Sequence, residues 1–179
     1  VEQSDLDVVF VATHEHAEPA IAALNAGKHV MVEKPIAFNL ELADQMIQAA
    51  EANQRKLMVA YNRRFDPSFE FALPLLGDMQ GPKLIRVHDF GGSFAVAGQM
   101  YDTYQRSDVS RETIEAAKAK SNSEALVAIG QDREAFLFNF VSLMLLCSHD
   151  ANILHEAFGL PDQILHAEVS PDGGMVTAI

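Results

Sequence analysis

The sequence predicts an α/β protein whose first part is a parallel sheet. Three short apolar runs, residues 7–12, 29–32 and 56–61, are rich in the β-branched and large apolar residues typical of buried strands. Two segments in which small and apolar residues recur at helical spacing, 17–26 and 39–52, separate these runs. Strand, helix, strand, helix, strand with short connections predicts parallel strands joined by right-handed crossovers.

The two helices carry their own start and stop signals. Gly27 supplies a left-handed stop for the first helix. Asn39 is a good N-cap for the second helix, whose expected inward positions include Leu42, Met46, Ile47 and Ala50. We expect the first strand, an uninterrupted apolar run, to be buried on both faces, as parallel strands usually are.

After Pro67 the pattern changes, and the alternation typical of a parallel sheet stops. The expected elements are a strand at 83–89, weak helices at 110–120 and 123–129, a long helix at 133–158 and a closing hairpin. Met and Phe residues between 136 and 144 are interpreted as core. The last strand, 175–179, has no partner element after it, so we expect the chain to be part of a longer protein.

Composition excludes several classes of function. The 179 residues carry a formal net charge of −12, which repels nucleic-acid phosphates, and no polybasic stripe for anionic lipid is present. The apolar stretch that ends at Cys147 is too short for a membrane span. Cys147 is the single cysteine and Val1 is not followed by a secretory signal, so we expect a reducing, cytoplasmic location.

Polar residues follow each of the three predicted strands. They are Thr13 to His16, then Glu33, Lys34 and Pro35, then Tyr61 to Arg64. Ligands of open parallel sheets bind at the carboxyl ends of the strands. The three clusters therefore predict one binding crevice.

The same segments resemble a known family. Val9-Phe10-Val11-Ala12-Thr13, His16-Ala17-Glu18, Ala23 to Val30, Glu33-Lys34-Pro35 and Tyr61 to Pro67 look like the cofactor-domain signature of the Gfo/Idh/MocA oxidoreductases. The resemblance is dense over the first third of the chain. It implies the C-terminal half of a Rossmann-type parallel sheet over residues 1–64, followed by part of an α+β substrate and oligomerisation domain with an open sheet over 65–179.

The resemblance also implies a cofactor and a kind of substrate. The cofactor would be NAD or NADP, the substrate a small sugar, cyclitol or related polyol, and the full-length protein a homo-oligomer. No G-x-G-x-x-G turn occurs in the 179 residues, so the family's phosphate-binding turn is expected upstream of Val1. The implied cofactor-binding residues are Thr13, His16, Glu33, Lys34 and Pro35.

Lys34 is the first candidate for catalysis. In the family the matching lysine lies close to the nicotinamide and the reacting carbon. An ammonium beside a positively charged ring and partly desolvated should release its proton more easily, and could relay the proton of a substrate hydroxyl. The alternative is an ion pair at the sheet edge. Pro35 either follows a cis peptide bond, as in family members, or simply ends the strand.

His149 matches a family histidine that faces the substrate, and an imidazole there could act as general acid or base. The family commonly has an aspartate four residues before this histidine and another three after it, where this chain has Leu145 and Asn152. Either Asp150 substitutes, another base acts, or the chemistry is altered. A satisfied core histidine is the alternative.

Further polar residues have open assignments. Asn62 and Arg64 match family positions near the ligands, with a structural salt bridge as the alternative for the arginine. His16 caps a helix or contacts the cofactor. His14 and His16 form an H-x-H pair, but no carboxylate or cysteine completes a metal site, so no metal is expected.

These residues support three hypotheses. The first is an NAD(P)-dependent dehydrogenase that exchanges a hydride with a carbinol carbon, using Lys34 and His149 as catalytic residues and Asn62, Arg64 and His149 to bind substrate. The second is a non-catalytic ligand-binding protein on the same fold. The third is that this chain alone is an inactive fragment.

Overall fold

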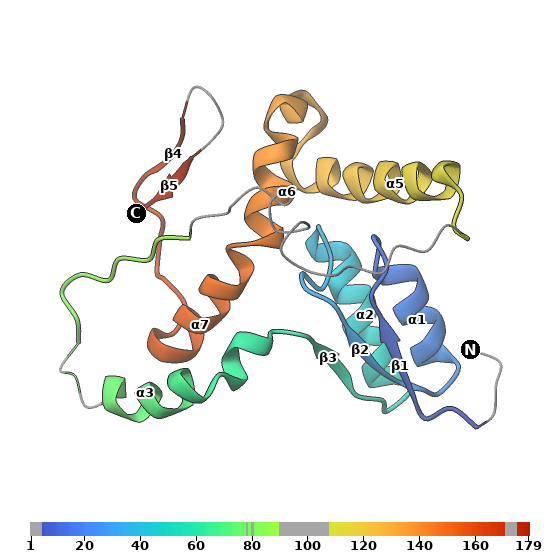
Figure 1. The fold of residues 1–179 in the computed structure, drawn as a ribbon, viewed down its shortest axis with the longest axis horizontal. Coiled ribbons are helices and arrows are strands. Elements are labelled where there is room, and N and C mark those ends of the chain that lie inside the picture. Colours follow the sequence, from blue (N-terminus) through green and yellow to red (C-terminus); the bar gives the residue numbers. More distant parts are fainter. Residues whose placement is uncertain (1–4, 78, 80, 90–107, 171–174) are drawn as a thin grey trace.

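The computed structural model describes residues 5–77, 79, 81–89, 108–170 and 175–179. Its first part is a three-stranded parallel sheet of order β1-β2-β3 (Figure 1). The elements follow in the predicted order β1 (Val8–Val11), α1 (Ala17–Asn25), β2 (His29–Val32), α2 (Leu40–Ala52) and β3 (Leu57–Val59). The predicted βαβαβ unit and its parallel pairing are therefore confirmed.

The sheet is covered on one face. Val11, Val30 and Val32 point to that face and form the core with buried residues of the two helices, of which Leu24 and Met46 are fully buried. Adjacent positions in the register point the other way, and there Val8 is 58% exposed and Phe10 55% exposed. The expectation that β1 is buried on both faces is wrong, because α1 and α2 pack on the same face and nothing in the described part of the chain covers the other.

The helix signals act as predicted, with one exception. Gly27 has a φ of 74°, the left-handed conformation that glycine adopts without strain. The side-chain oxygen of Asn39 accepts a hydrogen bond of 3.0 Å from the backbone N–H of Leu42. Ile47, expected to face inward, is 43% exposed, because Ala43, Met46 and Ala50 already form the buried stripe of α2.

The chain leaves β3 through a short 3₁₀ turn, η1 (Asn62–Phe65), and α3 (Pro67–Gly77). The strand expected at 83–89 is not formed. Residues 81–89 are exposed and irregular, and no described strand lies alongside to pair with them. An isolated strand has no ladder partner for its backbone groups, which explains why β-propensity alone did not produce one.

The helical part differs from the prediction at two places. The weak helices expected at 110–120 and 123–129 form one continuous helix, α5 (Arg111–Ile129), capped by Ser110. The long helix expected at 133–158 is divided into η2 (Gln131–Phe136), α6 (Leu137–Leu145) and α7 (Ser148–Phe158). The chain bends by 53° between the last two, where Ser148 and Asp150 favour the first turn of a helix over an interior.

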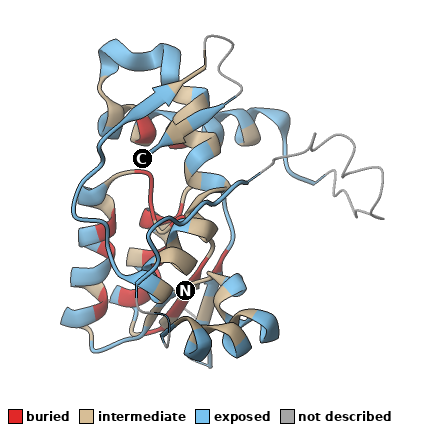
Figure 2. Ribbon diagram, turned by 90° about the vertical axis from the view of Figure 1, so that its left-hand side faces the viewer, coloured by how far each residue is buried: buried red, intermediate tan, exposed pale blue. Residues whose placement is uncertain are grey.

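Buried side chains concentrate in the sheet and its two helices (Figure 2). Ala125 is the sole buried hydrophobic residue that the structure describes beyond α2. The interpretation of residues 136–144 as core is wrong for several of them, since Phe136 is 50% and Phe138 77% exposed. The predicted closing hairpin is present as β4 (Ala167–Val169) paired antiparallel with β5 (Val176–Ala178).

Among the described helices, none is by itself long and apolar enough to cross a membrane. The segments Gln131–Leu145 and Ser148–Phe158 reach the necessary length and composition only when the bent pair is taken together.

Candidate functional site

A cavity of about 360 Å³ lies at the carboxyl ends of β1 and β2, where the sequence predicts a binding crevice. All five residues assigned to cofactor binding line it: Thr13, His16, Glu33, Lys34 and Pro35. Ala12, His14 and Phe38 complete this side of the cavity. The opposite wall comes from α5 and α6 and consists of Lys118, Ser121, Asn122, Val141 and Leu145.

The loops that end β1 and β2 are bonded to each other. The Nδ1 atom of His16 lies 2.7 Å from the carbonyl oxygen of Pro35, and it carries the hydrogen because a carbonyl only accepts. His16 is 8% exposed and immediately precedes α1, so it ties the start of this helix to the second loop. The peptide bond between Lys34 and Pro35 is cis, which agrees with the resemblance rather than with a plain strand terminator.

Helix α5 is held over the carboxyl end of the sheet by polar contacts. The hydroxyl of Ser121 donates a 2.7 Å hydrogen bond to the carbonyl oxygen of His14. Lys120 forms ion pairs with Glu15, at 3.4 Å, and with Glu18. At the start of α2, the side-chain amide of Asn39 donates to the carbonyl oxygen of Glu124 at 3.1 Å. These bonds place a helix distant in sequence against the predicted crevice.

Lys34 joins the sheet to α6. Its Nζ atom donates a hydrogen bond to the backbone carbonyl oxygen of Leu145, and its backbone N–H donates to Glu33 Oε2 at 3.2 Å. The position at which the family has an aspartate therefore still offers Lys34 an oxygen, but this oxygen comes from the main chain and carries no full charge. The ammonium has no ion pair among the described residues.

His149 lies on the first turn of α7 and does not line the cavity. Its ring meets Tyr61 edge to face, with centroids 6.1 Å apart, and its Nδ1 atom is buried without a hydrogen-bond partner among the described residues. Burial lowers the pKa of His149 below its ordinary value, and the positive charges of Lys34 and Arg63 lower it further. The neutral imidazole is the favoured form, in which one ring nitrogen has a lone pair that can accept a proton.

Asp150, the possible substitute for the missing aspartate, is paired with Arg63. One carboxyl oxygen accepts a hydrogen bond of 3.1 Å from Arg63, and the other is buried with no donor among the described residues. Carboxyl oxygens of Asp150 and Asp89 and the sulfur of Cys147 lie within 4.8 Å of one another. Burial raises the pKa of Asp150, Asp89 raises it further, and Arg63 opposes both.

This acid and thiol cluster is a weak metal site. Asp89 is exposed, and the three potential ligands combine two hard oxygens with one soft sulfur. Burial raises the pKa of the Cys147 thiol, and the carboxylates of Asp89 and Asp150 raise it too, so the metal-binding thiolate is disfavoured at neutral pH.

The remaining predicted residues lie elsewhere. Arg64 forms an ion pair with Glu156 of α7, which is the salt-bridge alternative considered from the sequence. It borders a separate cavity of about 570 Å³ with Tyr61, Phe69 and Asn152. Asn62 is exposed. The structure thus brings the five cofactor-site candidates together and leaves Asn62, Arg64 and His149 outside their cavity.

Four residues near these sites were not identified from the sequence. Three of them line the cavity, namely Lys118, Ser121 and Asn122, and the fourth, Asp89, lies beside Asp150. The first three share one face of α5 at spacings of three and four residues, which is a detectable helical pattern. Nothing local indicates that this face meets the end of the sheet, because the contact joins segments about a hundred residues apart.

The parallel sheet, its one-sided helices and the cavity at the strand ends define a Rossmann-type nucleotide-binding unit. Residues 1–61 match the family model described as "Oxidoreductase family, NAD-binding Rossmann fold". Over these residues the chain has the NAD-binding Rossmann fold of the Gfo/Idh/MocA oxidoreductases, which confirms the resemblance seen in the sequence.

Curated relatives agree with this assignment. A scyllo-inositol 2-dehydrogenase (NADP(+)) of Bacillus subtilis is 32% identical over 126 residues, which are 69% of this chain and 36% of that protein. A myo-inositol 2-dehydrogenase of Thermotoga maritima is 39% identical over 72 residues, covering 39% of this chain and 22% of that protein. The chain thus spans about a third or less of the length of these relatives.

A solved structure supports the fold over nearly the whole chain. The WlbA dehydrogenase of Thermus thermophilus, in complex with NAD and alpha-ketoglutarate, aligns with 91% of this chain and 42% of its own, with a TM-score of 0.52 and 19% identity. At this identity the likeness establishes the fold alone. It confirms the predicted α/β class with a Rossmann-type parallel sheet.

Proposed function

We propose that the protein is an NAD(P)-dependent dehydrogenase that exchanges a hydride with a carbinol carbon of a sugar, cyclitol or related polyol. The observation that carries this proposal is the gathering of Thr13, His16, Glu33, Lys34 and Pro35 around one cavity at the carboxyl ends of β1 and β2. The inositol dehydrogenases among its relatives support the polyol class.

The residues present fit the nicotinamide end of a dinucleotide. The cavity volume of about 360 Å³ lies within the range of roughly 300–1,000 Å³ common for ligand pockets. Its lining offers hydroxyl, imidazole and ammonium groups beside apolar side chains such as Phe38 and Val141, which suits a flat ring bearing a carboxamide and a ribose. When bound, the nicotinamide supplies the hydride acceptor or donor.

Lys34 is the residue that we place at the reacting hydroxyl. Its Nζ atom ends in the cavity wall beside Leu145, on a loop fixed by the His16–Pro35 hydrogen bond. Because its partner is a neutral carbonyl, the ammonium can turn toward a substrate oxygen without breaking an ion pair. In alcohol oxidation Nζ, when unprotonated, accepts the hydroxyl proton as the carbinol carbon loses hydride; in the reverse direction the ammonium returns it.

The alternative is a non-catalytic ligand-binding protein, and specific observations favour it. Leu145 replaces the aspartate expected from the resemblance, and His149 does not line the cavity that holds Lys34. A protein of this kind would bind nucleotide and polyol but would not transfer hydride between them.

The test uses the protein expressed from the whole open reading frame that contains these 179 residues. Reduction of NAD and NADP is followed by absorbance with scyllo-inositol, myo-inositol and a panel of aldoses, and cofactor binding is measured separately. We expect turnover with at least one polyol, and a loss of at least about a hundredfold in kcat for Lys34→Met.

Lys56→Met is the matched control, because Lys56 is exposed and precedes β3 at the amino end of the sheet, away from the cavity. Equal turnover in Lys34→Met and the wild type would contradict the assignment of Lys34. Retained cofactor binding with no turnover in the wild type would support the binding protein instead.

A further inference from the structure

The cavity lining has an unusual charge for this protein. The chain carries a formal net charge of −12, yet the cavity wall contains two lysines, Lys34 and Lys118, and one carboxylate, Glu33. The two lysines come from different walls, one from the sheet and one from α5. A cavity with a local excess of positive charge in an acidic protein favours a ligand that carries an anionic group.

The placement of Lys118 follows from how α5 is docked. Ser121 and Ala125 form the buried stripe of this helix, and Ser121 is bonded to the loop after β1. Lys118 precedes Ser121 by three residues and Asn122 lies one turn after Lys118, so both border the cavity next to Thr13 and His14. Glu15 of that loop and Glu18 in the first turn of α1 are already paired with Lys120.

Lys118 is available to a ligand. Its one ion pair among the described residues is with Glu115, at 3.4 Å, and the two side chains are 51% and 58% exposed. An exposed pair of this kind contributes little free energy, so an anion with several oxygens can compete for the ammonium. Asn122 is exposed beside it and offers a neutral N–H donor.

We propose that Lys118 and Asn122 form an anion subsite at the mouth of the cavity, which binds an anionic oxygen group of the nucleotide or of the substrate. The position beside Thr13 and His14 favours the phosphate attached to the nicotinamide ribose. A carboxylate of an acidic sugar is the other source of the same chemistry. This inference rests on the proposed function, and it assigns α5 a role in ligand recognition.

The phosphate is tested by comparing two probes that differ only in that group, reduced nicotinamide mononucleotide and reduced nicotinamide riboside. Dissociation constants are measured for the wild type and for Lys118→Gln, in protein from the whole open reading frame. The phosphate should tighten binding by about tenfold in the wild type and by about threefold or less in Lys118→Gln. Lys118→Arg keeps the charge and should retain most of the difference.

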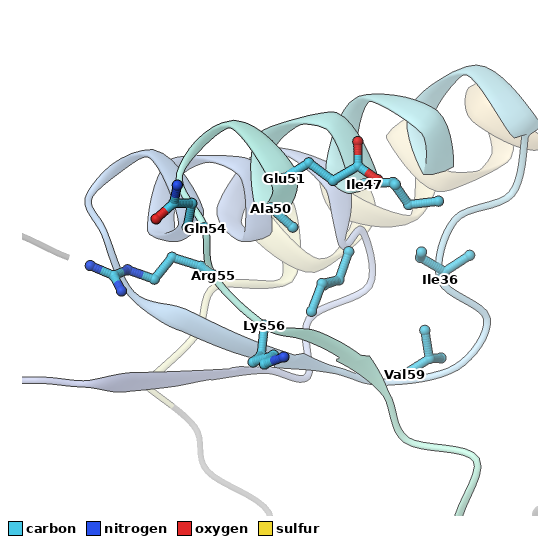
Figure 3. Close-up of a pocket in the computed structure, with 9 residues that line it drawn as sticks. Ile36, Ile47, Ala50, Glu51, Gln54, Arg55, Lys56 and Val59 are labelled. Carbon is cyan, nitrogen blue, oxygen red and sulfur yellow. The ribbon is translucent and has the colours of Figure 1, made fainter.

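Lys56→Gln is the matched control, since it removes the same charge from a residue that precedes β3 and lines a separate cavity beside α2 and β3 (Figure 3). The carboxylate is tested with glucuronate and glucose in the same variants, in the presence of saturating dinucleotide. A Lys118-dependent preference for glucuronate supports the subsite with the substrate as the source of the anion.

Two results would overturn the inference. If neither pair of probes responds to Lys118→Gln although the wild type binds nucleotide, the subsite is wrong and the proposed function stands. If the wild type binds neither NAD nor NADP, oxidised or reduced, both are wrong. A thermal melt of each variant separates lost binding from lost folding, and the exposed position of Lys118 predicts no change in Tm.

Discussion

Carboxyl oxygens of Asp89 and Asp150 lie within 4.8 Å of each other at the start of α7, and a single arginine, Arg63, pairs with the second of them. The other oxygen of Asp150 has no donor among the described residues. Two carboxylates this close repel unless a proton or a cation lies between them. Burial and the neighbouring Asp89 therefore raise the pKa of the Asp150 carboxyl above its ordinary value.

The raised pKa of Asp150 predicts a stability that falls as pH rises. The folded state binds the proton more tightly than the unfolded state, so this contribution is fully present below the ordinary value of 3.8 and is lost as pH rises through the folded pKa. Asp150→Asn keeps an oxygen for Arg63 and removes the charge. Its free energy of unfolding, measured by urea denaturation at neutral pH, should increase by no more than about 1 kcal/mol because the site is partly exposed.

Asp89→Asn should give the same direction of change, and Asp162→Asn, an exposed aspartate in the loop after α7, is the control. Midpoints that respond equally in all three variants would show that general charge repulsion, and not the pair, is responsible.

The lowered pKa of His149 predicts the opposite pH dependence. The fold favours the neutral imidazole, so this contribution is present above the ordinary value of 6.5 and is lost as pH falls from there through the folded pKa. His149→Gln should reduce the dependence of the free energy of unfolding on pH in this window. The ring resonances of His149, followed by NMR, should titrate below the ordinary histidine value of 6.5.

The side chain of Asn39 links α2 to α5. Its oxygen caps α2 and its nitrogen donates to the carbonyl oxygen of Glu124, and substitutions can remove these two bonds separately. Asn39→Ala removes the N-cap of α2 and the donor to Glu124, and should cost about 1–2 kcal/mol. Asn39→Asp preserves the cap and removes only the donor, so hydrogen exchange should accelerate in α5 and stay unchanged in the first turn of α2. Equal acceleration in both helices would refute this division.

Leu24 tests the core of the parallel unit. It is fully buried between α1 and the sheet, so Leu24→Ala should lower the free energy of unfolding by about 2–5 kcal/mol. Leu40→Ala removes the same atoms from a residue that is 83% exposed and should change stability by less than about 0.5 kcal/mol. Urea denaturation followed by circular dichroism measures both.

Local pattern was sufficient to predict the first part of the fold. The β-branched runs predicted the strands. Gly27 predicted the end of α1 and Asn39 the start of α2, because each of these signals acts within a few residues. The carboxyl-end rule predicted one crevice from three polar clusters. The cavity contains residues of the first two, but Tyr61 to Arg64, which follow β3, do not line it. The roles of these residues, and the division of the chain into two domains, stay predictions.

Only the tertiary structure decided which distant segments meet. It placed Lys118 of α5 in the cavity, tied Lys34 to the carbonyl of Leu145, and set Asp89 beside Asp150. It also decided two places where the prediction was wrong. Propensity favoured a strand at 83–89 and one long helix at 133–158, but the first is irregular and the second is divided. Periodicity along the chain determines which face of an element is apolar, but partners, bends and the polar bonds between segments depend on packing in three dimensions.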